Sequence, residues 1–282
     1  MEQTQKEKDR AAVIADLRAR ALNLRRHMVT QARGKGQGYL GQGLGIADFL
    51  ATMYFHEFEP QDLDFSRKER KRFLLSTGHY SIALWAVLAE HGIIPKSDLE
   101  SYGADGSPLE MSTMEGHLPG VEMTGGSLGH GLGVATGLAA GYRLDGLQST
   151  IHVEISDGEL QEGSTWEAAN TAAAFRLENL VCWVDRNGIQ ADGPLVVPVD
   201  PIDKRFEAFG WLTREIDGND LDQLLDAFEW AAQREGRPKV VVMRTRPGAG
   251  IKRIEQRDRA HFVRIDADEW DDVARELEAE NA

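Results

Sequence analysis

A strand–helix–strand unit in the middle of the chain is the feature that most constrains the fold. The alternating segment 151–155 is followed by a helical segment, 165–176, and then by an apolar segment, 180–184. Two strands joined through a helix are expected to lie parallel in one sheet, because the crossover packs back onto that sheet. The unit therefore predicts an α/β fold.

The same alternation of strands and helices continues on both sides of this unit. Further strands are expected at 72–75, 211–216 and 240–243, and helices at 8–33, 46–55, 80–90, 130–143, 220–234 and 267–280. We expect a single domain over residues 1–282 with N- and C-terminal helical extensions. Its core is predicted to be a doubly wound, mostly parallel sheet with helices on both faces.

Charge and hydropathy argue against two kinds of partner. The formal net charge of −14 disfavours nucleic acid and anionic membranes. The most apolar stretch, around 128–142, is shorter than the ~20 residues that a membrane span needs. The N-terminus is charged and has no apolar signal core. Cys182 is the single cysteine and lies in an apolar run, so we expect a buried core thiol in a cytoplasmic protein.

The ends of the two central strands carry a candidate metal and phosphate site. Asp157 lies at the end of the first strand and Asn187 just past the end of the second. Ligands of open α/β sheets bind at that edge. The Asp157 carboxylate, the Asn187 carbonyl and a backbone carbonyl near Ile189 are oxygen ligands of the kind that Mg²⁺ prefers, completed by phosphate and water. Gly158 has no Cβ and would let the backbone approach a phosphate closely.

Asp-Gly pairs are common in ordinary turns, so Asp157 alone would predict little. The interval of 30 residues from Asp157 to Asn187, spanning strand, helix and strand, is much more specific. The helix between them is expected to begin at a capping box made by Ser164 and Glu167.

The segment SDGELQEGSTWEAANTAAAFRLENLVCWVDRNGIQADG, at 156–193, resembles the thiamine-diphosphate enzymes. Their signature is Gly-Asp-Gly followed, after a similar interval, by Asn, and Ser156 replaces the first glycine here. The Gln-Glu-Gly step and the Asn-Gly-Ile-Gln-x-Asp-Gly ending resemble transketolase in particular. The resemblance extends over about residues 10–280. It implies thiamine diphosphate and Mg²⁺ as cofactors, and transfer of a two-carbon ketol unit from a ketose to an aldose.

The resemblance also assigns cofactor contacts along the chain. Backbone groups of Gly126 and Leu128, in the glycine loop 124–131, are expected against the aminopyrimidine ring. Gly158 and Glu159 are expected among the cofactor-binding residues.

Four residues are candidate catalytic groups by the same resemblance. His79, in Ser-Thr-Gly-His, is expected to reach the diphosphate, and His117 to line the substrate pocket. His261 is expected to contact both the diphosphate and the substrate. Glu162, in the Gln-Glu-Gly step, is expected in a carboxylate network at a subunit interface or as an exposed acid at a helix start.

The first glycine-rich loop, 34–45, departs from the transketolase pattern. Transketolases usually carry Ser-Gly-His-Pro-Gly-Gly there, and alignment on Ala47-Asp48 places Tyr39 at the histidine position. Tyrosine titrates near 10 rather than near 6.5, so Tyr39 would stay neutral against a sugar. We therefore expect a non-standard ketose donor or acceptor. His130 also replaces a usual glutamine, and its role is open.

The resemblance covers only the first part of a full-length transketolase. The glutamate that activates the cofactor belongs, in that family, to a separate pyrimidine-binding domain. A separate C-terminal subunit carrying this domain is therefore implied, in an α₂β₂ assembly. Glycines spaced by four residues line one face of the helix that follows the second glycine loop: Gly129, Gly133, Gly137 and Gly141. Tight packing within the domain and a subunit interface both explain this spacing.

Two alternatives stay open. The alpha subunit of a 2-oxo acid dehydrogenase also bears Gly-Asp-Gly and Asn, but usually lacks the Ile-Gln-x-Asp-Gly ending and the Ser-x-Gly-His element. A non-catalytic regulatory homologue is disfavoured because Asp157, Asn187 and His79 are all present. The substituent on the sugar is open between phosphate, sulfonate and none.

Overall fold

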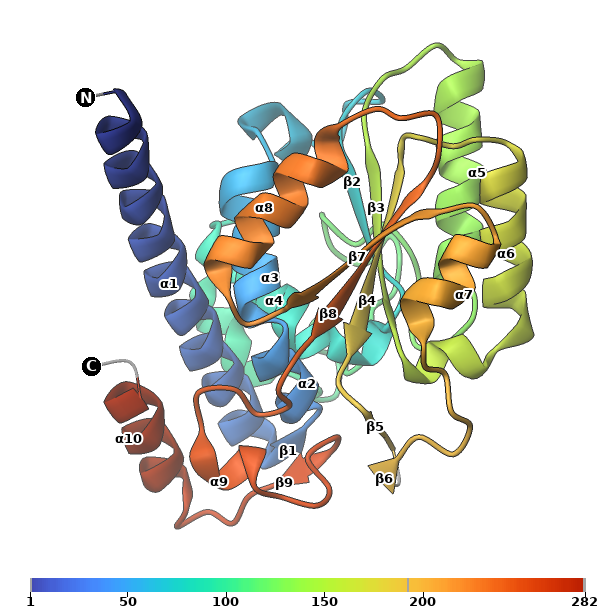
Figure 1. Ribbon diagram of the computed structural model, residues 1–282. Helices are drawn as coiled ribbons and strands as arrows, with labels where there is room; N and C mark the ends of the chain where they lie inside the picture. The colour runs from blue at the N-terminus through green and yellow to red at the C-terminus, as the bar shows by residue number, and fades with distance from the viewer. Residues whose placement is uncertain (1, 192, 281–282) are drawn as a thin grey trace.

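A parallel five-stranded sheet forms the centre of the molecule (Figure 1). The computed structural model describes residues 2–191 and 193–280. The strand order is β2-β3-β4-β8-β7, and every neighbouring pair in it is parallel. The bounds are β2 Arg72–Leu75, β3 Ile151–Ser156, β4 Leu180–Arg186, β7 Leu212–Asp217 and β8 Lys239–Arg244. The prediction of a parallel α/β sheet is confirmed.

The two faces of the sheet pack into two separate hydrophobic clusters. In β4, Val181 and Trp183 belong to one cluster, whereas Cys182 and Val184 belong to the other. This alternation follows from the strand geometry, in which successive side chains point to opposite faces. The buried position predicted for the Cys182 thiol is confirmed.

Helices cover both faces (Figure 1). The second cluster is closed by α5 Gly131–Leu144, α6 Gly163–Ala174 and α7 Ile202–Ala208. The first is closed by α3 Ala47–Thr52, α4 Ser81–Glu90 and α8 Leu221–Ala232. Because strands and helices alternate along the chain, each crossover places its helix on one of these faces.

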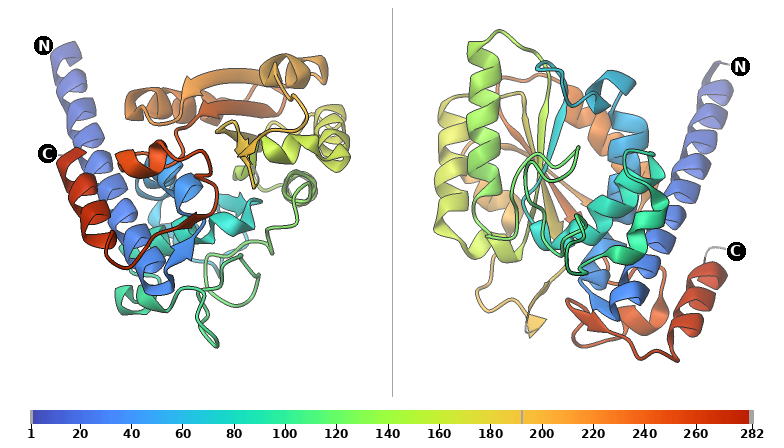
Figure 2. Two further views of the ribbon diagram at one scale, coloured as in Figure 1. Left: turned by 90° about the horizontal axis from the view of Figure 1, so that it is seen from below. Right: turned by 180° about the vertical axis from the view of Figure 1, so that it is seen from behind.

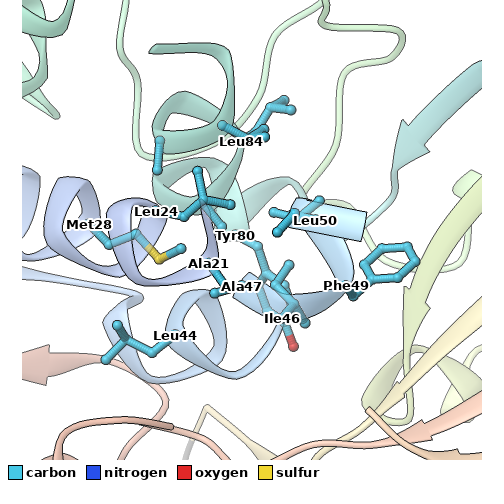
Figure 3. Close-up of a cluster of buried hydrophobic side chains, with 14 of the residues drawn as sticks. Ala21, Leu24, Met28, Leu44, Ile46, Ala47, Phe49, Leu50, Tyr80 and Leu84 are labelled. Atoms are coloured by element: carbon cyan, nitrogen blue, oxygen red, sulfur yellow. The ribbon is translucent and has the colours of Figure 1, made fainter. Parts of the chain in front are cut away.

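A long helix, α1 Glu2–Lys35, packs one face into the first cluster. It contributes Ala21, Leu24 and Met28 to that cluster, which also contains Leu44 and Phe49 (Figure 3). The last helix, α10 Trp270–Glu280, runs beside α1 (Figure 2).

The segments next to these two helices are joined by a short antiparallel pair, β1 Gln37–Gly38 with β9 Val263–Arg264. The remaining elements are α2 Leu40–Gly45, α9 Lys252–Glu255 and the hairpin strands β5 Ile189–Gln190 and β6 Gly193–Pro194. Single-turn helices lie at Met53–Glu57, Pro60–Leu63, Gly78–Tyr80, Lys96–Ser101 and Gly158–Gln161.

Three local predictions were wrong. The segment 34–45 is not all loop, because it contains α2, and the helix expected over 46–55 changes at Met53 into a π-helical turn. The capping box is absent. The helix α6 begins at Gly163, and the Ser164 hydroxyl donates instead to the Gly129 carbonyl, 2.9 Å away. Among the described residues, none of the helices has the length and apolar character that a membrane span requires.

Candidate active site

A cavity of about 390 Å³ opens at the carboxyl ends of β3 and β4. Eight of the residues predicted from the sequence line it: Tyr39, His79, Gly126, Leu128, Gly158, Glu162, Ile189 and His261. They come from segments spread over nearly the whole chain. The structure brings these segments together at the edge of the sheet where Asp157 and Asn187 also lie.

Asp157 and Asn187 lie together at the floor of this edge. Asp157 is fully buried, and its Oδ2 accepts a hydrogen bond from the Gly188 backbone N–H at 2.7 Å. Its Oδ1 is buried and has no hydrogen-bond partner among the described residues. The Asn187 side chain donates to Asp185 Oδ2 at 2.6 Å and to the Tyr80 hydroxyl at 3.0 Å. One carboxylate oxygen is therefore left available beside an oriented amide.

The acids of this region are held away from their charged forms. Burial, and after it the nearby Asp185, raises the pKa of Asp157 to about 7. Burial also raises the pKa of Asp185, although the Thr245 hydroxyl bonded to it acts in the opposite direction. A bound cation would restore the ionised carboxylates, since an opposite charge favours the charged form. Asp157, Asn187 and a backbone oxygen fit Mg²⁺, which takes few protein ligands and keeps phosphate and water as the others.

Metal ligation by acidic and imidazole side chains alone does not fit this site. Within residues 2–191 and 193–280, no three His, Cys, Asp or Glu side chains form a group that could hold a metal ion. A cation here would depend on the Asn187 carbonyl and on backbone and ligand oxygens. The Asn187 carbonyl oxygen accepts from the Ile189 N–H at 3.0 Å, which fixes the direction of the amide.

Glu159 holds the second glycine loop by a hydrogen bond, and Ser156 in turn bonds the backbone of Glu159. The buried Glu159 carboxylate accepts from the Gly129 N–H at 2.9 Å and from the Ser76 hydroxyl at 2.6 Å. It does not line the cavity. Ser156, the departure from the family's Gly-Asp-Gly, accepts a hydrogen bond from the Glu159 N–H at 3.1 Å. The serine therefore gives this turn a hydrogen bond that glycine could not provide.

The rings of Tyr39, His79 and His261 form one wall of the cavity. The Tyr39 ring lies 4.9 Å from His79 and 5.5 Å from His261, between ring centroids. The two imidazoles stack on each other at 5.2 Å with an interplanar angle of 8°. Burial, followed by the neighbouring His261, lowers the pKa of His79 to about 3. His79 is therefore a neutral imidazole near pH 7, able to donate from one nitrogen and accept at the other.

A contact between two glycines holds the His79 turn against the second glycine loop. A Cβ on Gly78 would lie 2.5 Å from the Gly126 nitrogen and 2.6 Å from the Gly125 Cα, so no larger residue fits. The Gly126 N–H donates to the Ser76 carbonyl at 3.2 Å, and Gly126 itself has φ +95°. This contact sets the distance between His79 and the backbone of Gly126 and Leu128.

The structure does not bring His117 into the cavity. Its side chain is 45% exposed and lies on a separate loop, where Nδ1 is 3.3 Å from Glu110 Oε1. Glu162 lines the cavity but is exposed. Asp192, from the Ile-Gln-x-Asp-Gly ending, lies outside the described residues.

The chain matches a family model described as "Transketolase, thiamine diphosphate binding domain" over residues 17–281. The chain belongs to the transketolase family. A transketolase family protein of Sinorhizobium fredii is 48% identical over 265 residues, covering 92% of this chain and 94% of that protein.

Two relatives of similar length are subunits of transketolases. One, from the apulose-4-phosphate transketolase of Actinobacillus succinogenes, is 37% identical, covering 94% of this chain and 97% of that one. The other, from the 6-deoxy-6-sulfo-D-fructose transketolase of a Clostridium species, is 34% identical, covering 92% and 96%. The recognition of a transketolase-type subunit from the sequence is confirmed.

Solved transketolases share the fold. The structure superposes on that of Leishmania mexicana with a TM-score of 0.83 and 25% identity, and on that of Campylobacter jejuni with 0.85 and 26%. Each match covers 94% of this chain but only 41% and 42% of those chains. The chain thus spans about two-fifths of the solved enzymes.

Sequence reasoning missed two members of this sheet edge. Asp185 could have been found, because a carboxylate ends the apolar run Leu180–Val184 and aligns with Ser156 across the sheet. Tyr80 gave no signal, since its hydroxyl meets Asp185 at 2.9 Å only through the tertiary fold.

Proposed function

We propose that this chain is the diphosphate-binding subunit of a two-component transketolase, transferring a two-carbon ketol unit from a ketose to an aldose. The match in length to two transketolase subunits carries the proposal, because the same chain spans only 41–42% of the solved enzymes from Leishmania mexicana and Campylobacter jejuni. These relatives give no support to a 2-oxo acid dehydrogenase subunit. A cytoplasmic location stays a prediction.

The cofactor site is proposed at the carboxyl edge of β3 and β4. Asp157, Asn187 and the Ile189 carbonyl would hold Mg²⁺. The Asp157 Oδ1, which is buried without a hydrogen-bond partner among residues 2–191 and 193–280, supports this assignment. Gly158 would admit a phosphate, because there is open space beside it. Even an added Cβ would be 3.6 Å from the nearest described side-chain atom. Thiamine diphosphate, when bound, supplies the carbanion chemistry.

Backbone groups of Gly126 and Leu128 would orient the aminopyrimidine ring, and the imidazoles of His79 and His261 would contact the diphosphate. Glu159 would act indirectly, by fixing the glycine loop through the Gly129 N–H. His79 is neutral near pH 7, so its role is to position and hydrogen-bond rather than to carry a charge.

The substrate end of the site is proposed at Tyr39 and His261. The phenol would replace the family's histidine with a bulkier hydroxyl-bearing ring, which supports a non-standard sugar. By their names, two relatives act on a phosphorylated and a sulfonated sugar, and we propose an anionic sugar for this chain as well. Replacing Tyr39→His should change the order of kcat/KM values across several ketoses; an unchanged order would reject Tyr39 as a specificity residue. His117 would reach the sugar only if its loop moved.

A separate subunit carrying the pyrimidine-binding domain is proposed as the partner, in an α₂β₂ assembly. The glycines of α5 support an interface. A Cβ added to Gly133, Gly137 or Gly141 would meet no atom of the described residues within 4 Å, so tight packing among these residues does not explain the glycines. Val134, on the same helix, is a large apolar side chain that is 42% exposed. Glu162 would lie at the edge of this interface.

Reconstitution with a candidate C-terminal subunit from the same host tests the proposal. Native mass spectrometry with Mg²⁺ and thiamine diphosphate should show two copies of each chain and two cofactors, and the complex should transfer ketol units. Asp157→Asn is the matched control, expected to assemble but to lose metal-dependent cofactor binding. A complex that assembles and binds cofactor but transfers nothing from any ketose would support the regulatory alternative.

A further inference from the structure

The turn that carries His79 is bonded to three buried carboxyl groups. Three hydroxyl groups of residues 76–80 each donate to a different one: Ser76 to Glu159 at 2.6 Å, Thr77 to Glu154 at 2.5 Å and Tyr80 to Asp185 at 2.9 Å. His79 lies within this segment, so its position depends on these bonds. The first and last of the acids also bond other groups of the site, whereas the Glu154 carboxyl bonds Thr77 alone among the described residues.

Glu154 occupies a position where the packing favours an apolar side chain. It lies in β3, is 0% exposed, and pairs across the sheet with Leu75 of β2 and Trp183 of β4. Both neighbours belong to the first hydrophobic cluster. The Glu154 Oε1 is buried and has no hydrogen-bond partner in residues 2–191 and 193–280. Because a buried polar atom without a partner costs free energy, stability alone does not explain an acid here.

The Glu154 carboxyl is held neutral by its surroundings. Burial, and after it the nearby Asp185, raises the pKa of Glu154 well above its ordinary value, although the bond from Thr77 acts in the opposite direction. A neutral acid still accepts a hydrogen bond, as the carbonyl oxygen of a glutamine amide does. What the protein gains from Glu154 is therefore an acceptor for Thr77 and not a charge.

The bond from Thr77 acts where the His79 turn begins. Thr77 is fully buried and directly precedes the single-turn helix Gly78–Tyr80. Its carbonyl accepts from the Tyr80 N–H at 2.7 Å, which closes the turn around His79. Fixing the Thr77 side chain to β3 therefore fixes the start of the turn, two residues before the imidazole.

We infer that Glu154 is a positioning residue of the proposed cofactor site, which holds His79 in place through the hydrogen bond from Thr77. The inference rests on the proposed transketolase function and deepens it by adding a residue that does not line the cavity. Glu154 acts on the diphosphate end of the site through the turn, without touching a ligand.

A double-mutant cycle between Glu154 and Thr77 tests this in the reconstituted complex. Glu154→Leu and Thr77→Val each remove one partner of the bond and keep a side chain of similar size. Each should weaken the binding of thiamine diphosphate, titrated in the presence of Mg²⁺, about five- to tenfold. The double variant should bind no more weakly than either single variant, because the same bond is lost in all three. Additive losses would overturn the inference.

Thermal stability separates positioning from a general effect on the fold. Each single variant leaves a buried polar group unpaired and should lower the Tm of the isolated chain. The double variant makes both groups apolar and should regain most of that Tm, while its affinity for the cofactor stays low. An affinity that returned together with the Tm would make Glu154 a purely structural residue and overturn the inference.

Two control variants bracket these results. Glu154→Gln keeps the acceptor and should bind the cofactor within about twofold of the unmodified complex; a loss equal to that of Glu154→Leu would overturn the inference. His152→Leu removes another buried polar side chain, two residues earlier on the same face of β3, which accepts from Trp183 Nε1 at 3.2 Å. It should lower the Tm and leave the affinity within about twofold. An affinity loss as large as that of Glu154→Leu would assign the effect to strand packing and overturn the inference.

Nuclear magnetic resonance of the isolated chain with labelled histidine gives a readout that needs neither cofactor nor turnover. The His79 imidazole signals, identified by their absence in His79→Gln, should shift or broaden in Glu154→Leu and Thr77→Val but not in Glu154→Gln. Unchanged His79 signals in Glu154→Leu would overturn the inference even if the complex transfers ketol units. Changed signals, in a protein whose complex transfers nothing from any ketose, would leave the positioning role standing and reject the transferase proposal.

Discussion

The contact between Gly78 and the second glycine loop makes Gly78→Ala an informative substitution. The new methyl would lie 2.5 Å from the Gly126 nitrogen and 2.6 Å from the Gly125 Cα, where ordinary contact begins at 3.4 Å. The two segments must therefore separate by close to 1 Å, and every atom that blocks the methyl belongs to the backbone of Gly125 or Gly126. Neither can move aside without displacing hydrogen bonds from the Gly125 and Gly126 N–H groups.

Overpacking of this kind costs about 1–3 kcal/mol, and a weakened hydrogen bond adds about 1 kcal/mol. The lower entropy of the unfolded alanine chain returns about 0.4–1 kcal/mol. The net cost is thus about 1–3.5 kcal/mol. For 282 residues, an unfolding entropy of about 2.1 cal/mol/K per residue gives about 0.6 kcal/mol/K, so Tm should fall by about 2–6 °C.

Differential scanning calorimetry of the isolated chain measures this shift, and titration with thiamine diphosphate and Mg²⁺ in the reconstituted complex measures its effect on the site. We expect the cofactor to bind at least about tenfold more weakly, because the His79 turn and the Gly126 backbone no longer keep their spacing. An alanine variant with unchanged Tm and unchanged cofactor affinity would refute the reasoning that this glycine contact sets the geometry of the site.

Three further predictions address the same region. Asp157→Asn should abolish Mg²⁺-dependent cofactor binding in calorimetry without lowering the Tm of the isolated chain, since it removes a buried acid beside Asp185; a large fall in Tm would contradict this. The pKa of His79 is about 3 in the folded chain, below its ordinary value near 6.5. As the pH falls, the unfolded chain therefore takes up this proton before the folded chain does. The neutral His79 thus contributes stability that is complete above pH 6.5 and is lost as the pH falls toward 3. Urea unfolding should show that the free energy of unfolding falls between pH 7 and pH 5, and that this fall is about 1–2 kcal/mol smaller in His79→Gln than in the unmodified chain. Equal falls in the two proteins would show that His79 is not held neutral. Gly137→Ala, with open space around its Cβ, should raise the Tm of the isolated chain by about 1–2 °C yet weaken association with the partner; unchanged association in native mass spectrometry would remove α5 from the interface.

The fold followed from the sequence because its strands are short, apolar and regularly separated by helices. The five predicted sheet strands were found with shifts of at most two residues at their ends. The strand order required the structure, since β8 lies between β4 and β7 although it follows both in the chain. No local pattern records which edge a strand joins.

The site divides in the same way. Asp157 and Asn187 could be placed because strand ends share one edge, whereas Ser164 was misassigned because a distant carbonyl, that of Gly129, took its hydroxyl. Tyr39 was selected by alignment alone, and its contact with both imidazoles depends on the chain meeting itself near its two ends. His117 lies on a loop whose course has no periodicity to predict.

The pairing of β1 with β9 has a consequence for the order of events during synthesis. Tyr39 leaves the ribosome early, but the strand that holds it beside His261 is among the last to be made. At about 5–20 residues per second, the first glycine-rich segment waits on the order of ten seconds or more for its counterpart. A nascent chain can thus complete its parallel sheet and still have an open, unfinished cleft. Chains interrupted before residue 263 should lack the strand that holds Tyr39 beside His261, and with it the finished cleft.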